Sequence, residues 1–172
     1  MDINRWWKRG PKLLNAASMD DIDNVVAGKN FQVRYLGRMD IDEDEDCDFN
    51  ETAGKFVGQY SPNSLTKLLH FDLVIDSMSV EIIDRHAHDV PKVIFVVPLS
   101  NVKNALFRKG CQKYADICIF VAQNESECSL KAHVLLCKSP ETAENIFKSF
   151  ERAFAVRSDM DRNNTVTNLR RS

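Results

Sequence analysis

The feature of the sequence that most limits the fold is a series of seven short apolar segments. In the first of them, Phe31, Val33 and Tyr35 alternate with polar residues, which is typical of a strand with one buried face. The run at 93–97 is apolar throughout and predicts a strand buried on both faces. Short connections between such segments predict an antiparallel sheet that closes into a small barrel or sandwich. The segments lie at 31–36, 71–75, 80–82, 93–97, 102–106, 117–121 and 130–136.

The pattern changes from alternation to helical spacing after the last of these segments. Ser139 is a suitable N-cap, and Pro140 suits the first helical position. Apolar residues then recur at steps of three and four, which predicts one amphipathic helix of about five turns that packs on the sheet. These residues are Ala143, Ile146, Phe147, Phe150, Ala153 and Phe154. The predicted fold class is therefore α+β, with a seven-stranded antiparallel barrel or sandwich capped by a C-terminal α-helix.

The segment between the first two strands is predicted to lie in solvent. Seven of the nine residues at 40–48 are acidic, and residues 50–61 contain scattered glycines, so neither stretch is expected to form a core element. A calcium loop that begins at Asp42 is rejected, because an EF-hand requires glycine and glutamate where this chain has Cys47 and Ala53. Beyond Ser61, a short helix is predicted.

A length of 172 residues predicts one domain with tails, and 44% hydrophobic with 28% charged residues is typical of a globular chain. We divide it into a basic-aromatic leader with a short helix at 1–27, the barrel domain at 28–157 and a mobile polar tail at 158–172. A net charge of −2 argues against bulk attraction to nucleic acid.

The cysteines and histidines give no pattern of a catalytic or metal site. Five cysteines at irregular spacings favour a reducing compartment, and we expect a cytoplasmic protein because no signal peptide or membrane-length apolar run is evident. Cys118, Cys137 and His133 lie in predicted core strands, where burial raises a thiol pKa. His86 and His88 form a polar turn and do not make a closed zinc site. We therefore expect no catalytic residue, metal or cofactor.

The leader contains Trp6 and Trp7 among basic residues, and two interpretations remain open. The cluster suits the interface of an acidic membrane, where amphipathic rings and cations are both favoured. Alternatively, a flexible leader packs one tryptophan onto the barrel. The basic residues that would contact lipid are Arg5, Lys8, Arg9 and Lys12.

Four segments in order resemble motifs of the phosphotyrosine-binding domains of the Numb, Disabled and engulfment-adaptor type. Val33-Arg34-Tyr35-Leu36-Gly37 is similar to the VKYLG of their first strand, and Pro98-Leu99 followed by Val102 is similar to PL-x-x-I. Lys131-Ala132-His133-Val134 resembles the CHVF-like strand, and the helix that ends in Ala153-Phe154 resembles the helix that ends in QAF. The resemblance covers residues 28–156.

This resemblance implies a pleckstrin-homology-like barrel and a non-catalytic adaptor. Such domains bind Asn-Pro-x-Tyr-like tails of receptors or signalling proteins by adding the peptide to the strand at 102–107, beside the last helix. Phe154 matches the helix residue that contacts the ligand, whereas Ile146 and Phe150 match core positions. The implied peptide contacts are Val102, Lys103, Asn104, Ala105, Leu106, Phe107, Ile119, Phe147 and Phe154.

The chain departs from the family pattern in four places: the region between the first two strands is acidic where relatives carry a helix of mixed charge, the turn at 85–91 is longer than usual, and two departures lie at the implied peptide site. Val102-Lys103-Asn104-Ala105 stands where relatives read I-S-Y-C, and Ile119 stands near the small residue that often floors the tyrosine pocket. The alternative function is a headgroup-binding module of the same fold, recruited to the inner face of membranes through phosphoinositides or other acidic lipids.

Overall fold

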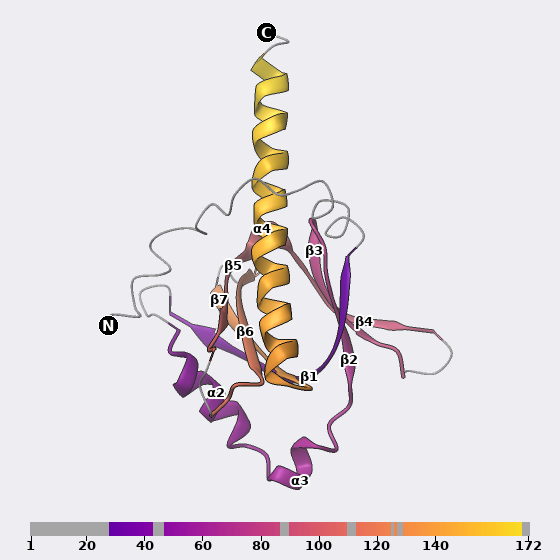
Figure 1. Cartoon of the computed structure of the whole chain (residues 1–172), viewed down its shortest axis with the longest axis vertical. Helices are drawn as coiled ribbons and strands as arrows, with labels where there is room; N and C mark the ends of the chain where they lie inside the picture. The colour runs from indigo at the N-terminus through magenta and orange to yellow at the C-terminus, as the bar shows by residue number, and fades with distance from the viewer. Residues whose placement is uncertain are drawn as a thin grey trace.

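The structure is a computed structural model that describes residues 28–42, 47–86, 90–109, 113–124, 126 and 129–169, of which 164–169 are described by their backbone alone. Seven antiparallel strands form one hydrogen-bonded sheet, and a long C-terminal helix crosses it (Figure 1). This confirms the predicted fold class. The strands are β1 (Lys29–Ile41), β2 (Phe71–Ile75), β3 (Ser79–Asp84), β4 (Lys92–Pro98), β5 (Val102–Phe107), β6 (Ile117–Asn124) and β7 (Ser129–Cys137); the helices are α2 (Phe49–Val57), α3 (Pro62–Leu65), the short η2 (Leu99–Asn101) and α4 (Pro140–Leu169).

The sheet folds around β1, which belongs to both of its halves. The strand order is β4-β3-β2-β1-β7-β6-β5, and β1 pairs with β2 through its first half and with β7 through its second. The partners change at Val33, which lies opposite both Phe71 and Cys137, and a register shift between Tyr35 and Gly37 follows within the pairing with β7. Gly37 has a φ of 134°, and a Cβ there would lie 2.8 Å from a ring carbon of Phe56, so only glycine fits without displacement.

The main core lies between the two halves of the sheet and α4. Alternate residues of the strands face inward, and the helix contributes Ala143, Ile146, Phe150 and Ala153, all fully buried. The expectation that Ile146 and Phe150 are core residues is confirmed. Apolar burial on this scale dominates the stability of a domain of this size.

A second core lies on the opposite face of β6 and β7, and it corrects the predicted solvated loop at 50–61. Residues 49–57 form α2, which begins after Asp48 accepts a hydrogen bond from the amide of Glu51 at 3.0 Å. Phe49, Ala53 and Phe56 are buried against the sheet. Their spacing of four and three residues was a readable helical signal, but the acidic residues that precede it obscured it.

The prediction that residues 93–97 are buried on both faces is wrong, because β4 ends the sheet. Phe95 and Val97 face the core, but Val93, Ile94 and Val96 are 48%, 41% and 51% exposed. A continuous apolar run does not distinguish an edge strand from a central one, because the partners of a strand lie far away in the sequence.

The predicted end of the C-terminal helix near Asp159 is also wrong. Helix α4 continues to Leu169, about 45 Å from its start, and Figure 1 shows it extending well past the sheet. Val156 is the last buried residue of the helix within the core. Residues 158–169, predicted as a mobile tail, are therefore helical. The leader at 1–27 lies outside the described residues.

Candidate functional site

The second edge of the sheet, β5, provides an open strand beside α4. It pairs with β6 alone among the described strands, from Val102 opposite Ala122 to Phe107 opposite Cys118. A register shift between Val102 and Asn104 leaves Lys103 without an opposite residue and exposed to solvent. The outer side of an edge strand carries backbone donors and acceptors that no neighbouring strand satisfies, so β5 can accept a further strand.

Two contacts determine which flank of α4 faces β5. The ring of Phe147 lies 6.2 Å from the ring of Phe107, and Glu144 accepts a hydrogen bond at 3.0 Å from Lys109, just beyond the end of β5. Phe154, two turns further along, is half-buried, with its ring 6.2 Å from that of Phe150. Because Phe147 and Phe154 lie on the same flank, they form an aromatic wall beside the open edge.

The predicted contact residues lie in three environments. Lys103 is exposed, and Asn104, Phe107, Phe147 and Phe154 are half-buried, so a ligand on the edge can reach all five side chains. Val102 and Ala105 are buried, so only their backbone can contact a ligand. Leu106 is half-buried and packs against the second core.

The prediction that Ile119 contacts a ligand needs correction. Its side chain is 0% exposed and lies in the second core with Phe49, Ala53 and Phe56 of α2. Because α2 covers this face, Ile119 cannot contact a peptide on β5 while α2 is in place. The sequence could not show this coverage without predicting α2.

The charges around the wall are unevenly paired. Glu144 binds both Lys109 and, at 2.9 Å, Lys148, and its hydrogen bonds to Lys148 and Lys109 lower its pKa. Glu151, one turn after Phe147, is half-buried, and burial raises its pKa. Glu151 is not among the contacts expected from the sequence, although its spacing of four residues from Phe147 was the available signal.

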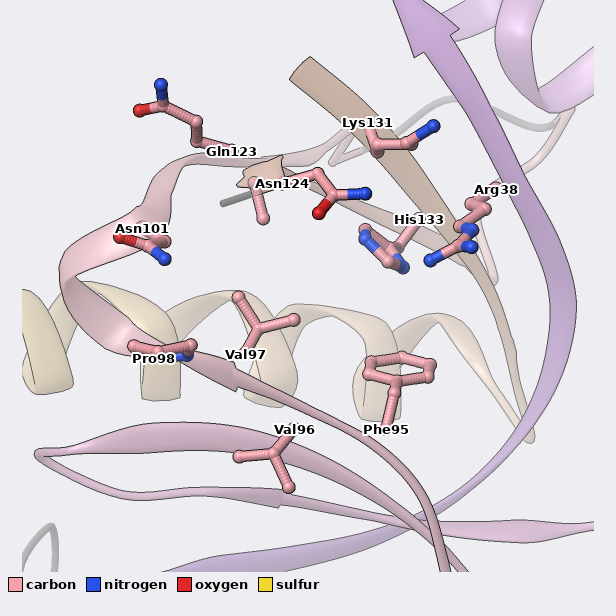
Figure 2. A pocket seen from close by; sticks show the side chains of 11 residues that line it. Arg38, Phe95, Val96, Val97, Pro98, Asn101, Gln123, Asn124, Lys131 and His133 are labelled. Carbon is pink, nitrogen blue, oxygen red and sulfur yellow. The ribbon is translucent and has the colours of Figure 1, made fainter. Parts of the chain in front are cut away.

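A separate pocket of about 190 Å³ opens between β4 and the far ends of β1, β6 and β7 (Figure 2). In Figure 2, Arg38 and His133 lie beside each other, with Phe95 below them. Lys131 also lines the pocket, but it forms an ion pair with Asp40 at 2.7 Å. Burial lowers the pKa of His133 to about 4, so its ring is neutral near pH 7. Arg38 therefore provides most of the net charge of the pocket.

The buried thiols are poorly suited to nucleophilic chemistry. Cys118 and Cys137 are 0% and 2% exposed, and burial raises the pKa of the Cys137 thiol to about 12. A thiol in this state is protonated and unreactive at neutral pH. No cluster of three metal-ligating side chains occurs among the described residues. In the same part of the chain, no helix is long and apolar enough to cross a membrane.

The comparisons with known proteins find a match in structure and none in sequence. No family model matches the chain, and no curated protein matches it. The solution structure of the C-terminal phosphotyrosine interaction domain of APBB2 from mouse matches with a TM-score of 0.58 and 16% identity, over 73% of this chain and 85% of that domain. The chain has the fold of a phosphotyrosine interaction domain. At this identity the likeness concerns the fold, and the function is argued from the site.

Proposed function

We propose that this chain is a non-catalytic adaptor domain that binds a short extended peptide as an additional strand on β5, alongside α4. The open β5 edge beside the aromatic wall is the observation that carries the proposal. Strand addition satisfies the outward backbone groups of β5, and the half-buried rings of Phe147 and Phe154 provide contacts for alternate side chains of the peptide.

The proposed ligands are Asn-Pro-x-Tyr-like segments in the cytoplasmic tails of receptors or signalling proteins. Two observations support this class: the four motif segments of the sequence, and the fold shared with the APBB2 domain, whose name refers to phosphotyrosine. Lys103 is the exposed cation of the β5 strand, so it is the residue through which the charge of a tyrosine phosphate would be recognised.

The experiment that tests the proposal is an NMR titration of the ¹⁵N-labelled full chain with synthetic Asn-Pro-x-Tyr peptides, with and without phosphate. We expect the largest amide shifts at residues 102–107 and along the Phe147–Phe154 flank. A peptide in which alanine replaces Asn, Pro and Tyr is the control. Shifts that centre on β4 or on Arg38, or no shifts with any peptide, would contradict the proposal.

The alternative function is binding of acidic lipid headgroups. It is supported by Arg5, Lys8, Arg9 and Lys12, which lie outside the described residues, together with Trp6 and Trp7. Sedimentation with vesicles that contain phosphatidylserine or phosphoinositides, using the full chain and a chain that lacks residues 1–12, separates the two functions. If lipid binding is the function, the deletion removes vesicle binding; if peptide binding is, the deletion leaves peptide affinity unchanged.

A further inference from the structure

One acidic residue lies within the aromatic wall. Glu144, Phe147, Glu151 and Phe154 follow one another at steps of three and four residues, so they share one flank of α4. The contacts of Phe147 with Phe107 and of Glu144 with Lys109 direct this flank toward β5. Glu151 therefore lies between the two aromatic side chains, on the side of the open edge.

The two acids of this flank differ in how their charge is compensated. Glu144 is held by Lys109 and Lys148 at 3.0 and 2.9 Å. Glu151 makes no hydrogen bond or ion pair with any other residue in the described part of the chain, although it is half-buried. Burial raises its pKa and the nearby charge of Lys148 offsets part of this shift, which indicates a carboxylate that has lost part of its water without gaining a hydrogen-bond partner.

We propose that Glu151 makes the open β5 edge selective for peptides that carry a lysine or arginine facing α4. This inference rests on the proposed function. A cation at this position would supply the charge-assisted hydrogen bond that the carboxylate lacks, beside rings that exclude part of the water. An acidic ligand side chain at the same position would be repelled.

The arrangement of α4 and β5 also gives the position of the basic residue in the peptide. Glu144 lies beside Lys109 and Phe147 beside Phe107, so α4 starts at the C-terminal end of β5 and runs toward its start. A peptide antiparallel to β5 therefore runs parallel to α4. Glu151 lies about 6 Å beyond Phe147 along the helix, and alternate residues of a strand are about 6.8 Å apart. The basic residue is thus two positions after the apolar residue that contacts Phe147.

The test measures binding of fluorescein-labelled synthetic peptides to the full chain by fluorescence anisotropy. Each peptide has an Asn-Pro-x-Tyr segment preceded by eight residues, and lysine, glutamine or glutamate is placed in turn at each of those eight positions. We expect one position at which lysine binds about five- to tenfold more tightly than glutamate, as for a charge-assisted contact. The positions on either side of it should show little preference.

Three variants assign the preference to Glu151. In Glu151→Gln the ratio of the lysine and glutamate affinities should fall close to one, and in Glu151→Lys it should reverse. Glu141→Gln removes the same charge from an exposed position in the first turn of α4, ten residues before Glu151, so it should keep the wild-type ratio. Adding salt should reduce the wild-type ratio.

The outcomes separate the two proposals. If peptides bind but Glu151→Gln keeps the wild-type ratio, or if no position distinguishes lysine from glutamate, selection by Glu151 is overturned while the proposed function stands. If no peptide binds the wild-type chain, strand addition on β5 fails, and the inference about Glu151 fails with it.

Discussion

The hydroxyl oxygen of Tyr35 on β1 lies 3.1 Å from Nδ1 of His133 on β7, and the two side chains join the strands across the inner face of the sheet. The imidazole ring also stacks on Phe120, with the ring centres 4.5 Å apart and the planes 1° from parallel. Burial raises the pKa of Tyr35 to about 12 and lowers that of His133 to about 4. Near pH 7 a protonated tyrosine and a neutral imidazole therefore share one hydrogen bond, and the tautomer of the imidazole sets which group donates.

This pair predicts a loss of stability in mild acid. The pKa of His133 in the folded chain, about 4, is below the ordinary value of 6.5, so between these values the unfolded chain binds a proton that the folded chain does not. The contribution of the neutral His133 ring to the free energy of unfolding is complete above pH 6.5. It falls by about 3 kcal/mol as the pH drops toward 4. Urea unfolding of wild type and His133→Gln between pH 7.5 and 4.5 measures this loss. The difference between the unfolding free energies of the two proteins should become smaller as the pH falls.

A direct check follows the imidazole itself. In the folded wild-type chain, the NMR signals of the His133 ring should not titrate between pH 7.5 and 5.5. A midpoint for His133 near 6.5 would contradict the expected burial of a neutral ring.

Two phenylalanines of α4 should have opposite effects on stability and binding. Phe150 is 0% exposed, so Phe150→Ala leaves a cavity and should lower the free energy of unfolding by about 3 to 5 kcal/mol. Phe154 is half-buried in the wall, so Phe154→Ala should weaken peptide binding by about 1 to 3 kcal/mol while the fold survives. Thermal unfolding and anisotropy titrations measure the two effects. Equal melting and equal binding of the variants would show that the two faces of α4 are wrongly assigned.

The charge of the ligand should be recognised at Lys103. If this exposed cation contacts a tyrosine phosphate, Lys103→Ala should reduce the preference for a phosphorylated over an unphosphorylated tail peptide, by about tenfold. Calorimetric titration of both peptides into both proteins gives the two ratios. An unchanged ratio would show that Lys103 acts as a solvated lysine that protects the edge from aggregation.

The same substitution on two adjacent strands should distinguish the inner from the outer face of β3 and β4. Val80 is 0% exposed, whereas Val96 is 51% exposed. Val80→Thr places a hydroxyl in the core and should cost about 1 to 3 kcal/mol of unfolding free energy, but Val96→Thr should cost less than about 0.5 kcal/mol. Chemical denaturation of both variants makes the comparison. A large loss with Val96→Thr would indicate that β4 is covered in solution.

The secondary structure of residues that repeat with a strand or helix period could be predicted from the sequence. Alternation identified six of the strands, a continuous apolar run identified β4, and Ser139, Pro140 and the apolar steps of the next four turns identified the start and buried face of α4. In the site, the same periods identified the β5 strand and placed Phe147 and Phe154 on one helix. Each of these assignments depends on neighbours in the sequence, because side-chain direction repeats every two residues in a strand and every 3.6 in a helix.

The features that could not be predicted from the sequence depend on contacts between segments that are far apart in the chain. The apolar run of β4 predicts a central strand. In the described structure β4 is an edge strand, because no other strand pairs with its outer side. The sequence predicts Ile119 as a ligand contact, but α2 covers its side chain in the folded chain. The role proposed for Glu151 depends on the position of β5 beside its flank of α4. The sequence by itself determined the existence of the strands, the start of the main helix and, except in β4, their buried faces, since these follow local periodicity. Only the tertiary structure decided the edges, the covered face and the unpaired carboxylate, since these depend on which distant segments pack together.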